Sequence, residues 1–73
     1  MDKIIDRRAY LVNNDGTLTQ TRLHEYTDRG DLYTSTGAPV ERTGETQRLA
    51  GWPDTDVEVG RCNTTKYYIG EVI

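Results

Sequence analysis

The sequence predicts a mostly β domain: a small antiparallel five-stranded sheet or partly open barrel, with one short helix near residues 45–50 or a loop in its place. Three observations support this fold class. Thr occupies 11 of the 73 positions, and β-branched residues favour strands over helix interiors. Turn residues divide the chain into short pieces. Residues 54–59 alternate strictly between two kinds of side chain, as a strand with two different faces requires.

Two strands are expected at residues 3–13 and 17–27, joined by a hairpin turn at Asn13–Gly16. Asp-Gly in that turn suits the positive-φ positions of a tight hairpin. In the second strand Leu23 is out of phase with the other large side chains. A β-bulge near Arg22 restores the phase, so we predict one there.

A second turn at residues 28–31 precedes a third strand at residues 32–36, which ends at Gly37-Ala38-Pro39. The next segment, residues 40–53, is the least regular. Its residues 45–50 lie between glycines and are long enough for one or two helical turns ending at Gly51, but helices this short are marginal in water. Helix and loop are therefore both open for this segment.

Two further strands, at residues 54–59 and 66–73, follow with a turn at residues 62–65 between them. Aliphatic residues concentrate near the two ends of the sequence, so we expect the first and last strands to pair and to close the sheet. These aliphatic residues are Ile4, Ile5, Leu11 and Val12, and then Val57, Val59, Ile69, Val72 and Ile73.

Composition predicts one small domain over residues 1–73 with a lean core. Leu, Ile, Val and Phe together make up only 14 residues, but a net charge of −3 and six aromatic rings argue against a disordered chain. Ordering costs roughly 1.5 kcal/mol per residue, so a thin core gains from covering apolar surface with a second copy. A homodimer is therefore expected.

The charge balance disfavours nucleic acid as a general partner, because phosphate contacts require a basic surface and the sequence pI is about 4.9. No stretch approaches the length of a membrane span, and residues 1–8 do not resemble an export signal. We therefore expect a cytoplasmic protein that has no membrane partner. The lone Cys62 predicts neither an intramolecular disulfide nor a cysteine-based zinc site.

The chain offers few groups for catalysis, so we expect no enzyme activity, no catalytic residue and no cofactor. His24 and Cys62 are the sole imidazole and thiol, and neither is flanked by residues that activate a nucleophile. The glycines do not have the spacing of a phosphate loop. A row of Asp54, Asp56 and Glu58 on one strand face could gather a cation, but the solvated face of an edge strand explains it better. No metal site is predicted.

The surface is the most informative feature. Seven arginines stand against two lysines, and the guanidinium group suits bidentate contacts at interfaces. Tyrosines serve either as core filler or as interface anchors, and Trp52 either covers one end of the barrel or anchors a partner. The predicted partner-binding residues are Trp52, Tyr33, Tyr67, Tyr68, Arg48, Asp54, Asp56 and Glu58.

These observations predict a non-enzymatic protein-binding module, a small regulator or inhibitor of the kind that phages and plasmids often encode. Its partner is expected to be another protein with a basic surface that faces the acidic row. The alternative is a small β-barrel that binds single-stranded nucleic acid, with tyrosines stacking on bases and Arg7, Arg8, Arg22 and Arg61 contacting phosphates.

Overall fold

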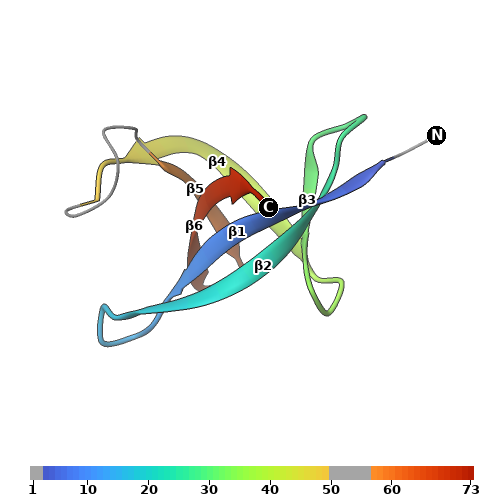
Figure 1. Cartoon of the computed structure of the whole chain (residues 1–73). Helices are drawn as coiled ribbons and strands as arrows, with labels where there is room; N and C mark the ends of the chain where they lie inside the picture. Colours follow the sequence, from blue (N-terminus) through green and yellow to red (C-terminus); the bar gives the residue numbers. More distant parts are fainter. Residues whose placement is uncertain (1–2, 50–56) are drawn as a thin grey trace.

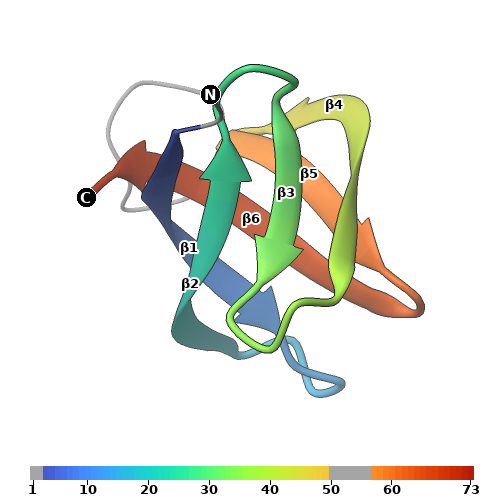
Figure 2. The same ribbon diagram turned by 90° about the vertical axis from the view of Figure 1, so that its right-hand side faces the viewer.

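The computed structural model describes residues 3–49 and 57–73. Within these residues every regular element is a strand, and six antiparallel strands pair in a closed ring in which the last returns to the first (Figure 1). Figure 2 shows β2 and β3 on the near side of the ring and β5 and β6 behind them. The strands are β1 (Ile4–Val12), β2 (Leu18–Tyr26), β3 (Asp31–Thr34), β4 (Pro39–Gln47), β5 (Val57–Cys62) and β6 (Thr65–Val72).

The predicted mostly β, antiparallel architecture is confirmed, but the described residues form six strands rather than five. The additional strand is β4, which occupies the segment where a short helix at residues 45–50 was one alternative. Residues 45–47 belong to β4, residues 48–49 have no regular structure, and residue 50 lies outside the described residues. A helix is wrong here because this backbone pairs with β5 and bends at Gly44, whose φ is 79°.

The predicted bulge near Arg22 is also wrong. The register between β1 and β2 runs unbroken from Ile4 opposite Tyr26 to Val12 opposite Leu18. Leu23 is buried because its face of β2 points into the ring. It is out of phase with Leu18, His24 and Tyr26 because these side chains lie on the outer face. Register shifts instead occur where β1 meets β6 and where β4 meets β5. Such bulges increase local twist and so help a small sheet to close.

The pairing of the first and last strands is confirmed. Tyr10 lies opposite Tyr68 and Ala9 lies opposite Ile69. The Arg7 side chain adds a bond of its own, because its Nε donates to the Gly70 carbonyl oxygen at 3.0 Å. Figure 1 shows β1 and β6 side by side. This contact leaves neither terminal strand as a free edge over its paired length.

The predicted turn at Asn13–Gly16 forms, with Gly16 at a φ of 87°. The Asp15 carboxylate accepts bonds from the hydroxyl of Thr17 at 2.6 Å and from its backbone N–H at 3.0 Å. These two bonds hold the pKa of Asp15 below its ordinary value, because both favour the charged carboxylate. The turn therefore uses its aspartate as a local hydrogen-bond acceptor.

Side chains on the two faces of the ring form two separate apolar clusters. The interior cluster contains the fully buried Leu23 and the nearly buried Leu32. Alternation along β5 and β6 sends other residues to the outer side, where Val59 and Tyr68 form the centre of a second cluster. The interior cluster is Ala9, Leu23, Leu32, Val40, Tyr67 and Ile69; the outer cluster is Val57, Val59 and Tyr68, with Tyr10, Val12 and Leu49 packed against it.

Gly60 allows the strands to approach closely inside the ring. A Cβ atom at this position would lie 2.9 Å from Cγ1 of Val40 and 3.1 Å from Cδ1 of Ile69. These distances are shorter than van der Waals contact, so the interior is already filled by the neighbouring aliphatic side chains. The small number of aliphatic residues is thus offset by tight packing at this point.

Candidate protein-interaction surface

The outer face of β1, β2 and β3 brings aromatic, apolar and charged side chains together. Antiparallel register places His24 opposite both Asp6 on β1 and Tyr33 on β3, and it places Ile4 opposite Tyr26. Residues directly opposite each other in a sheet project from the same face. We call this set the outer patch; it consists of Ile4, Asp6, Arg22, His24, Tyr26 and Tyr33.

The outer patch has an aromatic centre. The rings of Tyr26 and Tyr33 meet edge to face with centroids 5.2 Å apart and an interplanar angle of 73°. Arg29 lies over the Tyr26 ring, 5.5 Å from its centroid, and its Nε donates to Asp31 at 2.8 Å. Both tyrosines are half-buried, and Ile4 beside them is 51% exposed. The two rings are held in place while part of their surface still faces solvent.

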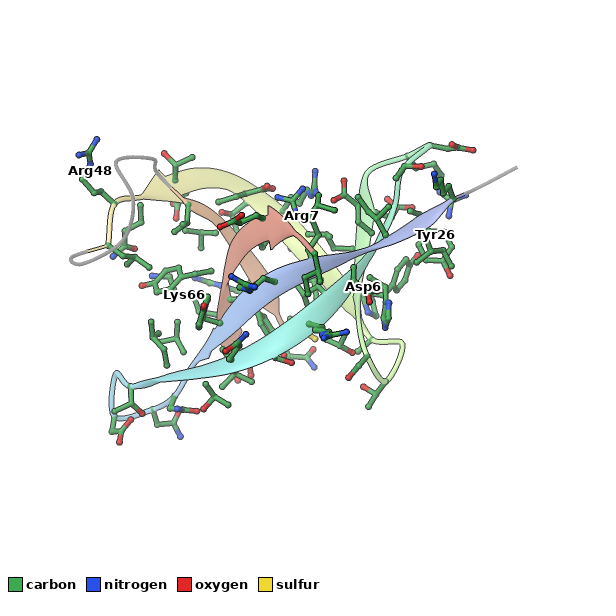
Figure 3. All side chains as sticks on the ribbon, viewed as in Figure 1. Asp6, Arg7, Tyr26, Arg48 and Lys66 are labelled. Atoms are coloured by element: carbon green, nitrogen blue, oxygen red, sulfur yellow. The ribbon has the colours of Figure 1, made fainter. Side chains whose placement is uncertain are left out.

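Charged groups flank the aromatic centre. Nδ1 of His24 lies 3.0 Å from one Asp6 carboxylate oxygen, and a guanidinium nitrogen of Arg22 lies 3.6 Å from the other. The Asp6 and His24 side chains are each 38% exposed, so both remain accessible to a partner. Figure 3 places Asp6 and Tyr26 at one end of the molecule, with Arg48 and Lys66 at the other.

The Asp6–His24 pair resembles the orienting half of a catalytic triad, but the Cys62 thiol does not lie beside it. Cys62 packs against the interior cluster, whereas His24 projects from the outer face of β2. The two residues are therefore on opposite sides of the sheet and do not form a dyad. The arrangement around His24 suits hydrogen bonding to a partner.

Four charged residues on the inward-facing side of their strands form a continuous chain of ion pairs, of which Arg42 is exposed. Glu25 contacts both Arg7 and Arg42, each at 3.1 Å, through its two carboxylate oxygens. Arg42 also contacts Glu58 at 3.3 Å. The Glu25 side chain is only 12% exposed. This interior ion-pair chain joins β1, β2, β4 and β5, and each charge in it has a partner of opposite sign.

The predicted partner-binding residues lie in different parts of the structure. Tyr33 lies in the outer patch, and Arg48 is exposed just after β4. Tyr67 and Tyr68 are 8% and 7% exposed, so they contribute to the interior and outer clusters, respectively.

The acidic row is not seen as a row in the described residues. Glu58 faces the interior and pairs with Arg42, and β5 is hydrogen-bonded on both sides, so the interpretation as an edge strand is wrong. Trp52, Asp54 and Asp56 lie outside the described residues. Among the predicted residues that the structure describes, only Tyr33 is thus brought into the outer patch.

The sequence contained a signal for the other members of the patch. The Asp-Gly turn fixes the register of the first hairpin, and that register alone places Asp6 opposite His24. The turn ending at Gly30 in the same way places His24 opposite Tyr33. The two registers together are therefore the signal in the sequence that identifies the patch.

Burial affects the phenol group of Tyr67 in the interior cluster. The pKa of Tyr67 is raised above its ordinary value, first because burial disfavours the phenolate and second because a charged Cys62 would lie nearby. The described residues contain no group of three or more His, Cys, Asp or Glu side chains placed to hold a metal ion. They also contain no helix of the length and apolarity that a membrane crossing demands.

Among the described residues, the outer patch is therefore the surface on which aromatic, apolar and charged groups converge. No family model, curated protein or solved structure matches the chain.

Proposed function

We propose that the chain is a non-enzymatic protein-binding module that uses the outer patch to contact another protein, as a small regulator or inhibitor in the cytoplasm. The observation that carries this proposal is the Tyr26–Tyr33 pair, whose rings contact each other edge to face and are still partly exposed. Tyrosine and arginine are enriched among the residues that dominate binding energy at protein interfaces. Ile4 adds exposed apolar area beside them.

The ion pairs of the patch support a contact with a polar rim. Asp6 is shared between His24 and Arg22, and each of these groups keeps exposed hydrogen-bonding capacity. Such groups set the orientation and specificity of a complex more than its strength. The expected complex therefore has an aromatic centre surrounded by charged groups.

Site-specific photocrosslinking in the native host tests this proposal. A photoreactive amino acid replaces Tyr33 in one variant and the exposed Glu45 of β4 in a control variant. We expect a discrete crosslinked partner from the first position and none from the second. Tyr33→Ala should then weaken binding of that purified partner at least about tenfold, and Glu45→Ala should leave it unchanged. Equal crosslinking from both positions, or unchanged binding by Tyr33→Ala, would contradict the proposal.

A second candidate function, binding of single-stranded nucleic acid, is favoured by one observation. Arg8 and Arg22 are exposed directly opposite each other on the face that carries the tyrosines. Arg22 contacts Asp6 but its side chain is still 64% exposed, so both guanidinium groups are free to contact phosphates. Titration with a fluorescent oligonucleotide at low salt tests this function, which requires binding that weakens steeply as salt is added. Arg7, assigned to phosphate contact in this alternative, is instead part of the interior ion-pair chain.

A further inference from the structure

Half of β2 has an open edge, to which no other strand of residues 3–49 and 57–73 is paired. β1 pairs with the whole of β2, but β3 pairs only with the part from Leu23 to Tyr26. Figure 1 shows the β1–β2 hairpin extending beyond β3. The open part, residues 18–22, is exposed at every position except the half-buried Thr21. A strand edge of this kind presents unpaired backbone groups and can accept another strand.

The hairpin register determines which backbone groups face the open edge. The Asn13 N–H donates to the Thr17 carbonyl oxygen at 2.8 Å. At the other end of the hairpin, the Thr27 N–H donates to the Lys3 carbonyl oxygen at 3.0 Å. Hydrogen-bonded pairs alternate along an antiparallel ladder, so odd-numbered residues of β2 bond to β1 and even-numbered ones direct their N–H and C=O groups away from it. The even-numbered residues of the open part are Leu18, Gln20 and Arg22.

Arg22 is the one charged side chain on this edge, and the other usual protections against strand addition are missing from it. Residues 18–22 contain no proline, no lysine and no bulge. The free edge of β4 differs, because β4 is bulged around Gly44, and the Thr43 hydroxyl there donates to the Val59 carbonyl oxygen at 2.9 Å. A bulge interrupts the regular spacing that an incoming strand would need.

We infer that the open edge of β2 pairs with the same edge of a second copy of the chain, antiparallel about a two-fold axis at Gln20. This register sets Gln20 opposite Gln20 of the second copy and Leu18 opposite Arg22 of the second copy. The backbone groups of these residues point outward, so each opposed pair can exchange both N–H···O=C bonds. The two hairpins would then form one continuous sheet.

Side-chain chemistry favours this register over its neighbour. The aliphatic part of Arg22 would cover Leu18 of the second copy, and Leu18 is 38% exposed in the single chain. Thr19 would lie opposite Thr21, which is a favourable cross-strand pair. Moving the axis to Arg22 would instead set two guanidinium groups opposite each other, which is unfavourable.

Charge substitution at Gln20 tests the inference with the purified chain alone, independently of any other partner. Sedimentation equilibrium should show a dimer for the unmodified chain. Gln20→Lys and Gln20→Glu should each raise the dissociation constant at least about tenfold, because each sets like charges across the axis. An equimolar mixture of the two variants should restore the dimer. Glu45→Lys, on exposed β4, is the matched control and should leave the dissociation constant unchanged.

A backbone variant distinguishes strand pairing at this edge from an effect of the Gln20 side chain. Gln20→Pro removes an N–H that the β1–β2 pairing does not use, so circular dichroism should remain that of the folded chain while the dimer is lost. A chain that stays monomeric at all concentrations overturns the inference. So does a dimer that Gln20→Lys leaves intact, or a failure of the Lys and Glu variants to associate when mixed.

Discussion

Removing the Glu25 carboxylate should destabilise the fold more than removing any exposed carboxylate. In the variant Glu25→Gln, Arg7 and Arg42 both lose the anion that lies 3.1 Å from each of them inside the ring. Breaking a buried ion pair by removing one partner costs about 3–5 kcal/mol. The two guanidinium side chains are 22% and 34% exposed, so water compensates for part of this loss. We therefore expect a decrease of roughly 2–3 kcal/mol in the free energy of unfolding.

Two comparison variants, Glu58→Gln and Glu45→Gln, show how the loss of stability depends on burial of the carboxylate. Glu58 contacts only Arg42 in the interior ion-pair chain and its side chain is 29% exposed, so Glu58→Gln should cost about 1 kcal/mol. The exposed Glu45 is the control, and Glu45→Gln should change stability by less than about 0.5 kcal/mol. Urea unfolding followed by circular dichroism measures all three, with roughly 4–8 °C in Tm for each kcal/mol as a second readout. Equal stability of the Glu25→Gln and Glu45→Gln variants would refute the reasoning.

Three further predictions concern the backbone and the core. Gly60→Ala should lower the free energy of unfolding by about 1–3 kcal/mol in urea titrations, because its Cβ would lie 2.9 Å from Val40; an unchanged midpoint would contradict the packing described. Gly44→Ala should cost roughly 1–2 kcal/mol and Gly44→Asn less, since its φ is 79° and Asn tolerates this conformation better; thermal unfolding checks the order of the two. The raised pKa of Tyr67 predicts a contribution to stability that is complete below the ordinary tyrosine pKa of 10.0 and is lost as pH rises through the folded value. Unfolding of the chain and of its Tyr67→Phe variant at increasing alkaline pH measures this, and parallel pH profiles would count against it.

Local patterns in the sequence predict five of the six strands, all except β4. The Asp-Gly dipeptide before Thr17 predicts the first hairpin, and the aliphatic residues near the two ends of the sequence predict that β1 and β6 meet. The sequence does not predict β4 because the bend at Gly44 interrupts the alternation of its side chains. Once a bulge shifts the phase, a period of two residues no longer shows in the sequence.

The interior of the ring could not be predicted from local patterns. Alternation separates two faces of a strand, but it does not say which face is covered. Charged residues such as Glu25 and Glu58 are therefore assigned to the surface. Their burial depends on Arg42, which comes from a different part of the sequence and neutralises both carboxylates. The aromatic pair of the outer patch is different, because two turn registers suffice to place Tyr26 beside Tyr33.

The closure of β6 onto β1 has a consequence for folding kinetics. Arg7 and Gly70 are 63 positions apart in the sequence, and the bond between them forms only after the intervening chain is ordered. Proteins dominated by contacts between distant residues fold slowly, in milliseconds to seconds, because loop-closure entropy opposes the decisive step. A growing polypeptide that has not yet delivered Tyr67 and Ile69 lacks part of its apolar interior. Acquisition of the native state is therefore delayed until the final strand is available.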